Sequence, residues 1–491
     1  MILKGIINAF MPGNLLMALL GTTLGIVMGA LPGIGSTMTM ALLLPFTFWM
    51  SPAAALILLG SVYCGATYGG SISAILLNTP GTPASSATAF DGYPLAQKGK
   101  GMNAIGISAM ASFIGGTAGL LFLLFLAPPL ADISLLFGPA EFFLLTLFTF
   151  LIISVTILKE SVFKGLIALS AGMILATIGY DPVSGNVRFS FDISYLEDGI
   201  QLLPAIIGLF AVSEVFSLIE KGGTISSTPD AQGSIWQGFA DTFKYPRTLT
   251  ESTLIGSGIG ALPGIGVSAA NIIAYVVAKS HSSHASDFGT GAEEGVVAPE
   301  ASNNAVTCTS LIPALTLGIP GSSSAAVLLG ALMIHGLIPG AGLFTESGEV
   351  TYTFIFGLGI SNFCMLLVTV LFARLLVKIT VVNVSVLTPI ITSLCFIGAY
   401  SLRTSMGDVI VACVFGVVGY VMRRLRYPII CLLLPLILGS MMERGFHQAL
   451  MISGGSYGIF VQSPISKVIA CMIVLSLLWP VFGWLRQRAA K

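Results

Sequence analysis

The sequence predicts an all-α polytopic membrane protein of about 12 transmembrane helices, arranged as two inverted repeats whose helices are broken or re-entrant at Pro-Gly motifs. Hydrophobic residues make up 55% of the 491 positions and charged residues only 9%, which excludes a soluble globular surface. The sequence Gly-Ala-Leu-Pro-Gly-Ile-Gly occurs at 29–35 and again at 260–266, and a second Pro-Gly follows each copy, at 80–81 and at 320–321. Such a duplication in an apolar chain is typical of transporters built from two related halves.

Charge and cysteine content narrow the function classes. Acidic and basic residues number 21 each, so no nucleic acid or other strongly charged partner is expected. The seven cysteines stand singly in apolar runs, which favours small buried side chains over disulfides or a metal centre. The chain has no Walker phosphate loop, HExxH motif or dinucleotide fingerprint, so no cofactor is expected. The N-terminus lacks the features of a removable signal peptide.

The first half is predicted to cover residues 1–219. Residues 1–12 form a short amphipathic segment suited to the membrane interface. The motif region, 13–100, holds a helix to residue 30, a break at 31–35, a continuation to 49, and a second helix over 53–77 whose small residues at 63–70 allow another backbone to come close. The second Pro-Gly and the first charged loop follow. Four ordinary spans are expected near 103–130, 134–157, 163–180 and 199–219.

A polar linker and a second half follow. Residues 220–248, with Gly222-Gly223 and a Ser/Thr run, are predicted to form a cytoplasmic linker. The second half, 249–491, begins with its own motif region, 249–340, which carries an insertion at 281–300 that the first half lacks. About five further spans complete the chain.

The distribution of Lys and Arg predicts the orientation. Loops at 91–100, 159–164, 220–248, 374–378 and 423–426, together with the C-terminus, hold 15 of the 21 basic residues and are assigned to the cytoplasm. The first motif region then ends inside, at Lys98 and Lys100, and the second ends outside, near Glu346 and Glu349. This opposite orientation is the reason for predicting inverted repeats.

The Pro-Gly breaks predict the cargo site. A helix broken inside a bilayer is tolerable only where it lines a cavity or is buried by protein, and each break exposes a helix N-terminus with unpaired N–H groups and partial positive charge. Such ends hold carboxylates without a cationic side chain. The predicted substrate-binding residues lie at the four breaks and supply hydroxyl donors there: Pro32, Gly33, Gly35, Ser36, Thr37, Asn78, Thr79, Pro80, Gly81, Thr82, Ser85, Pro263, Gly264, Gly266, Ser268, Pro320, Gly321, Ser322 and Ser323.

Carbonyl and carboxylate oxygens beside the breaks predict a cation site. Alignment of the halves at their second Pro-Gly pairs Tyr63-Cys64 with Asn303-Asn304. The candidate Na⁺ ligands are Asn78, Glu300, Asn303 and Asn304, because hard cations prefer oxygen donors. The plainer interpretation keeps the Pro-Gly pairs as kinks and Glu300 as part of a solvated acidic loop.

One short motif points to an enzyme. Gly454-Gly455-Ser456-Tyr457-Gly458 fits the G-x-S-x-G pattern, which would make Ser456 the nucleophile of an intramembrane hydrolase. The pattern is short and the chain is rich in Gly and Ser, so coincidence is the favoured explanation and the protein is predicted not to be an enzyme.

These motifs together resemble a known family. Both copies of the seven-residue motif, Leu77-Asn-Thr-Pro-Gly81, Asp91-Gly-Tyr-Pro94, Ala298-Pro-Glu300 and Leu317-Gly-Ile-Pro-Gly321 are similar to the large membrane subunit of the tripartite tricarboxylate transporters. The resemblance covers essentially the whole chain. It implies a multi-pass permease of the bacterial inner membrane that works with a small four-helix membrane subunit and a periplasmic solute-binding protein, and that takes up a citrate-like carboxylate by symport, commonly with Na⁺. The helices outside the motif regions are expected to form a scaffold and to offer a homodimer contact. The rivals are an ion-coupled carboxylate permease that works alone and a passive channel.

Overall fold

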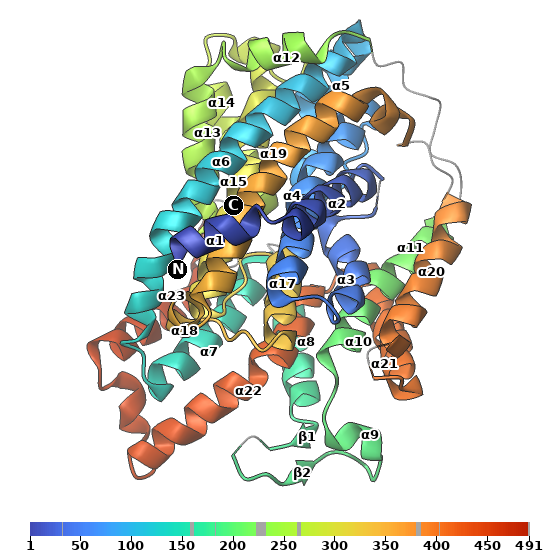
Figure 1. The fold of residues 1–491 in the computed structure, drawn as a ribbon. Helices are drawn as coiled ribbons and strands as arrows, with labels where there is room; N and C mark the ends of the chain where they lie inside the picture. The colour runs from blue at the N-terminus through green and yellow to red at the C-terminus, as the bar shows by residue number, and fades with distance from the viewer. Residues whose placement is uncertain are drawn as a thin grey trace.

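The structure is a helical protein with helices of very different lengths (Figure 1). The computed structural model describes residues 1–491 apart from 32, 158–161, 182, 222–231, 263–266, 380–383, 402 and 490–491. Proline and glycine interrupt many of the helices, because proline lacks the backbone N–H that a continuing helix needs.

The first half contains a broken helix, a long buried helix and a series of ordinary helices. These elements are α1 (Ile2–Ala9), α2 (Pro12–Gly29), α3 (Ser36–Thr47), α4 (Pro52–Leu77), η1 (Pro83–Ser86), α5 (Ala89–Leu95), η2 (Ala96–Lys100), α6 (Gly101–Ser134), α7 (Pro139–Ile157), α8 (Val162–Ala176), α9 (Ser194–Glu197), α10 (Leu202–Ile206), η3 (Ile207–Val212) and α11 (Ser213–Lys221). The predicted helices and the first break are confirmed to within a few residues.

The second half repeats the order of broken and long helices. Its elements are α12 (Ile235–Thr242), α13 (Pro246–Gly260), α14 (Val267–His281), η4 (Ala285–Asp287), α15 (Glu294–Thr309), α16 (Leu311–Leu317), α17 (Ser323–Ile334), α18 (Ala341–Thr345), α19 (Gly348–Ile379), α20 (Val384–Ser401), α21 (Met406–Arg424), α22 (Ile429–Ile452), η5 (Tyr457–Val461) and α23 (Pro464–Ala489). Helix α12 lies within the predicted linker and packs on α6.

Strands are nearly absent from the described residues. The two strands, β1 (Gly179–Tyr180) and β2 (Val187–Arg188), pair antiparallel with Gly179 opposite Arg188. They lie at one end of the molecule, beside α9 (Figure 1).

The helices have the length and composition of membrane spans. Within the described residues, seven helices are long and apolar enough to cross a bilayer: Pro12–Gly29, Pro52–Leu77, Ala89–Ser134, Leu202–Glu220, Gly348–Lys378, Met406–Arg424 and Ile429–Ile452. Shorter apolar helices accompany them: Ser36–Thr47, Pro139–Ser154, Val162–Ala176, Ser323–Ile334, Thr388–Ser401 and Pro464–Ser476. The predicted class, an all-α polytopic membrane protein, is confirmed.

Glycine contacts repeat between the two halves. A Cβ at Gly25 on α2 would lie 2.6 Å from the backbone oxygen of Val62 on α4, and a Cβ at Gly256 on α13 would lie 2.6 Å from that of Ser302 on α15. Each glycine stands four residues before its copy of the seven-residue motif, and Val62 and Ser302 each stand 18 residues before Pro80 or Pro320. The helix pairs α2 with α4 and α13 with α15 therefore pack at corresponding positions, and only glycine permits this distance.

Candidate functional site

A cavity of about 330 Å³ lies where the helix breaks of both halves meet. Its volume falls within the range of about 300–1,000 Å³ that is usual for small-molecule sites. The described residues that line it are Ser36, Thr37, Tyr63, Thr67, Thr82, Pro83, Ala84, Ile153, Val267, Ser268, Pro320, Gly321, Ser322, Ser323, Ser324 and Ile430.

Two reciprocal contacts bring the breaks together. The first break of the N-terminal half leads into α3, which packs against α17, the helix after the second break of the C-terminal half (Figure 1). Ser324 on α17 lies 2.8 Å from the hydroxyl of Ser36 and 2.9 Å from that of Thr37. In the same way α14, after the first break of the C-terminal half, packs against η1, and Asn271 Nδ2 donates to the carbonyl of Ala84 at 2.8 Å. Each half therefore supplies one break to each side of the cavity.

Helix N-termini and hydroxyls set the electrostatics of this cavity. Helices α3, α14 and α17 begin at or beside its lining residues, and Ser322 caps α17 by accepting from the N–H of Ala325. The described lining includes no Asp, Glu, Lys, Arg or His side chain. Helix N-termini carry partial positive charge, so the cavity suits an anionic group without a basic residue.

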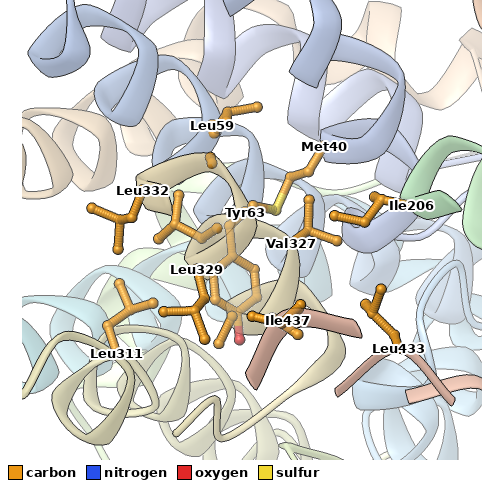
Figure 2. Packing of buried hydrophobic residues seen from close by; sticks show 14 of the residues in the cluster. Met40, Leu59, Tyr63, Ile206, Leu311, Val327, Leu329, Leu332, Leu433 and Ile437 are labelled. Carbon is orange, nitrogen blue, oxygen red and sulfur yellow. The ribbon is translucent and has the colours of Figure 1, made fainter. Parts of the chain in front are cut away.

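Tyr63 is a cavity residue that the sequence did not identify as a site residue. Its ring is 2% exposed and lies among apolar side chains such as Val327 and Leu329, with its oxygen at one end (Figure 2). The hydroxyl lies 2.9 Å from Ser322 Oγ and 3.3 Å from Ser310 Oγ. The sequence signal that could have identified Tyr63 is its alignment with Asn303, because the two residues place a polar group at corresponding positions of the two halves.

The structure gathers part of the predicted substrate-binding set. Eight of its residues line the cavity: Ser36, Thr37, Thr82, Ser268, Pro320, Gly321, Ser322 and Ser323. Pro32, Pro263, Gly264 and Gly266 lie outside the described residues. The others surround the breaks without lining the cavity: Gly33, Gly35, Asn78, Thr79, Pro80, Gly81 and Ser85. Their role in binding stays a prediction.

Asn78 and Gly81 have structural explanations. Asn78 is exposed and ends α4 in the left-handed conformation, with φ at 53°. Gly81 donates its N–H to the carbonyl of Gly70 at 3.2 Å, and a Cβ there would lie 1.9 Å from the backbone oxygen of Gly29. This contact holds the second break of the N-terminal half against α2 and α4.

Three of the four predicted cation ligands, Glu300, Asn303 and Asn304, are buried on α15. Asn78 is exposed at the end of α4. Asn303 is buried and directs its Nδ2 toward the carbonyl of Thr67 at 3.5 Å, whereas Asn304 directs its Nδ2 toward the sulfur of Met365 at 3.3 Å. Glu300, Asn303 and Asn304 lie at helical spacing on α15, and the Oδ1 atoms of both asparagines are buried without a hydrogen-bond partner among the described residues. The role of the four residues as Na⁺ ligands stays a prediction.

Glu300 is fully buried and sits among hydroxyls, which contradicts its interpretation as part of a solvated loop. Its Oε1 accepts from Ser71 at 2.5 Å and from Thr88, and its Oε2 accepts from Ser108 and Ser112, each at 2.9 Å. We call these four residues with Glu300 the Glu300 cage. A buried carboxylate is tolerated only when hydrogen bonds or opposite charge compensate for its lost hydration.

Ser456 lies in a different environment. It is exposed in the turn between α22 and η5, and its Oγ accepts from the N–H of Gly458 at 3.3 Å. Among the hydrogen bonds of the described residues, none joins its Oγ to a histidine or a carboxylate. The strand-to-helix turn that positions a G-x-S-x-G nucleophile is replaced here by a helix-to-helix turn.

Comparison with known proteins supplies the family. The model of the tripartite tricarboxylate transporter TctA family matches residues 15–434. An uncharacterized 52.8 kDa protein of Agrobacterium vitis, from the TAR-I ttuC' 3' region, is 35% identical over 475 residues, which cover 96% of this chain and 94% of the relative. A second uncharacterized protein of Agrobacterium vitis, from the TAR-II ttuC' 3' region, is 36% identical over 211 residues, which cover 43% of this chain and 87% of that relative. No solved structure matches the chain. The match over most of the sequence shows that this chain belongs to the tripartite tricarboxylate transporter TctA family, as a multi-pass membrane subunit.

Proposed function

We propose that this chain is the large permease subunit of a tripartite secondary transporter that takes up a citrate-like tricarboxylate or a related organic acid by symport. The proposal rests mainly on the cavity in which helix N-termini and hydroxyls from both halves meet, with no charged side chain among its described lining residues. Helix N-termini bind carboxylates through unpaired N–H groups.

The cavity chemistry favours moderate selectivity. Ser36, Ser322 and Thr82 are among the residues that offer hydroxyl donors, and Ile153 and Ile430 add apolar surface. A site made of helix N-termini and hydroxyls binds a carboxylate group, but it discriminates less between anions of different net charge than a site with paired arginines would. Selection among organic acids therefore belongs to a periplasmic solute-binding protein that delivers the cargo, and a small four-helix membrane subunit completes the complex in the bacterial inner membrane.

Alternating access would move the breaks relative to the other helices. The contact between α3 and α17 and the contact between α14 and η1 both lie beside the cavity. We propose that one of these contacts opens at a time, and that the remaining helices form the scaffold and a homodimer contact. A cation gradient drives uptake, and Na⁺ is the coupling ion that the family resemblance implies.

Uptake by the purified chain in proteoliposomes tests the proposal. Labelled citrate and succinate are offered with an inward Na⁺ gradient, with and without the small subunit and the binding protein. The expected result is accumulation that needs both partners and the gradient. Equal uptake without partners would establish a permease that works alone, and flux without any gradient would establish a channel. Absence of uptake for every carboxylate, with the complex assembled, would refute the proposal. Ser456→Ala serves as a control and is expected to transport normally, whereas loss of uptake there would favour the hydrolase.

A further inference from the structure

The segment that carries β1 and β2 lies at the opposite end of the molecule from α12 (Figure 1). We call residues 179–199 the hairpin loop. Its two ends touch, because a Cβ at Gly179 would lie 2.5 Å from the backbone nitrogen of Gly199. Four carboxylates and one arginine within these residues place the loop outside the hydrocarbon core of a bilayer. Since α12 belongs to the predicted cytoplasmic linker, the predicted orientation puts the hairpin loop on the periplasmic side.

Two polar anchors fix the hairpin loop to the helices. Arg188 donates to Glu443 of α22 through both terminal nitrogens, at 2.6 and 3.0 Å. Tyr195 donates its hydroxyl to Asp408 of α21 at 2.5 Å, and Arg403 donates to the same carboxylate at 3.0 Å. Asp408 is fully buried. The stretch between these anchors is therefore held in place, which lowers the entropy that a partner would lose on binding it.

Apolar side chains are exposed around and between the anchors. Val187, Phe189, Phe191 and Ile193 occupy every second position, and they are 41, 60, 75 and 51% exposed. We call these four residues the Phe191 patch. Gathered apolar side chains on a surface mark contact sites, and aromatic residues are enriched in protein interfaces.

The backbone of the Phe191 patch is strained. Phe189 and Phe191 have φ values of 52° and 51°, in the left-handed region that bulky side chains rarely adopt. Both rings are more than half exposed, so burial does not offset this cost. Strain of this kind is typical of functional sites.

Carboxylates flank the Phe191 patch. Asp192 is exposed, and none of the described ion pairs includes it. The side chain of Asp198 is 68% exposed and lies 3.9 Å from Arg403. These charges repel anionic lipid headgroups and attract a protein surface that carries Lys or Arg.

Resting on the proposed function, we propose that the Phe191 patch is the docking site of the soluble carboxylate-binding protein. That protein receives the phenylalanine rings in an apolar pocket, and basic residues beside the pocket face Asp192 and Asp198. A soluble partner is favoured over a membrane-embedded one because the charged hairpin loop lies outside the hydrocarbon core. The anchors to α21 and α22 connect the docked protein to the helices of the permease.

Binding of the citrate-loaded binding protein tests the site. The full-length chain is held in nanodiscs together with the small membrane subunit. We expect Phe189→Asn and Phe191→Asn each to lower the affinity about tenfold or more, as for a central aromatic contact. Phe243→Asn, which replaces a 61% exposed phenylalanine directly after α12, is the matched control and should bind like the wild type. Unchanged affinity in both patch variants, or no binding by the wild type, would overturn the proposal.

Thermal unfolding separates docking from a structural role. Asparagine adopts the left-handed region more readily than phenylalanine, and the Phe191 ring contributes little burial. We therefore expect Phe191→Asn to unfold at the wild-type temperature or above it while binding is weakened. A lower unfolding temperature that accompanies the loss of binding would identify Phe191 as a support of the fold and would overturn the proposal.

Association kinetics test the carboxylates. Asp192 also has a positive φ, 58°, which asparagine tolerates, so Asp192→Asn removes the charge without adding strain. We expect its association rate with the binding protein to fall about threefold at low ionic strength and to depend less on salt. An association rate and a salt dependence equal to those of the wild type would refute the charged contact.

The other possible occupants of the Phe191 patch give different results. Stronger quenching of Phe191→Trp than of the wild type by brominated lipids would place the patch in the bilayer. Loss of the small subunit or of a second copy from Phe191→Asn would place the patch inside the membrane complex. Either result would overturn the proposal. If the wild-type complex transports no carboxylate, the proposed function fails while the binding measurement still decides the docking site, and normal transport with normal docking of both asparagine variants would refute the docking site alone.

Discussion

The hydroxyls of Ser36 and Ser324 lie 2.8 Å apart although 288 residues separate them in the chain. Ser36 is the first residue of α3 and Ser324 lies in the first turn of α17, so this contact joins a break of one half to a break of the other. It lies at the cavity, where a cargo would compete for the same hydroxyls.

This contact should appear as energetic coupling between the two positions. We expect Ser36→Ala and Ser324→Ala to be non-additive, with a coupling free energy of about 0.5–1.5 kcal/mol, because one hydrogen bond of ordinary strength is shared. The measurement is a double-mutant cycle on the free energy of unfolding of the purified protein. Ser280, exposed near the end of α14, forms the control pair with Ser36 and should show no coupling. Additive effects for Ser36 and Ser324 would show that the contact contributes nothing.

Tyr63→Phe tests the hydroxyl that faces the cavity. The substitution keeps the buried ring and removes the oxygen that lies 2.9 Å from Ser322. We expect the apparent affinity for a transported carboxylate to fall about threefold to tenfold, because Ser322 loses the partner that orients its hydroxyl. We expect little change in stability, because the buried ring is kept. Concentration-dependent uptake in proteoliposomes measures this. Tyr352→Phe, beside Phe344 and outside the cavity, is the control. Equal affinities for Tyr63→Phe and wild type would exclude the hydroxyl from cargo recognition.

Composition and repetition predicted most of the fold. Long charge-free runs predicted the helices, and the identical motif at 29–35 and 260–266 predicted two related halves. In both halves a Cβ at the corresponding glycine, Gly25 or Gly256, would lie 2.6 Å from a backbone oxygen of the neighbouring helix. Proline and glycine act locally, so the breaks could be placed to within a residue or two.

The site was only partly predictable because it depends on contacts between distant segments. The sequence identifies Ser322 as a residue after a break, but the reach of Tyr63 to Ser322 depends on how α4 packs against α17. Glu300 was grouped with the asparagines that follow it, and the sequence did not predict that its carboxylate bonds to hydroxyls of α4 and α6. The hydroxyls of the Glu300 cage come from α4, from the residue before α5 and from α6, and no spacing in the sequence predicts that these three segments contact Glu300.

Replacing a closely packed glycine by alanine should lower the stability of the protein. Gly25→Ala and Gly256→Ala would each place a Cβ 2.6 Å from a backbone oxygen, which the packed helices can accommodate only by moving apart. We expect each to lower the free energy of unfolding by about 1–3 kcal/mol, the range for overpacking. Gly258→Ala on α13 meets nothing within 4 Å and should be neutral or stabilising, because alanine favours the helix. Thermal unfolding of the purified variants measures the difference, and equal stability of Gly256→Ala and Gly258→Ala would contradict the packing argument.

The hairpin at β1 and β2 should loosen in acid. Asp181 Oδ1 accepts the N–H groups of Val183 at 2.8 Å and Ser184 at 3.1 Å, and these bonds lower the pKa of Asp181 below its usual value. A carboxyl whose pKa is lower in the folded state stabilises that state above its unfolded pKa of about 3.9, and the stabilisation is lost as the pH falls through the lower folded value. Arg188 lies 3.4 Å from Asp181 and is also held by Glu443 through two bonds, at 2.6 and 3.0 Å, so Asp181 is one of two carboxylates that hold this arginine. Cleavage of this segment by pepsin should therefore accelerate between about pH 4 and pH 2 in the wild type beyond the acceleration seen for Asp181→Asn, which lacks the titrating group. Identical pH profiles for the two proteins would show that Asp181 does not hold the hairpin.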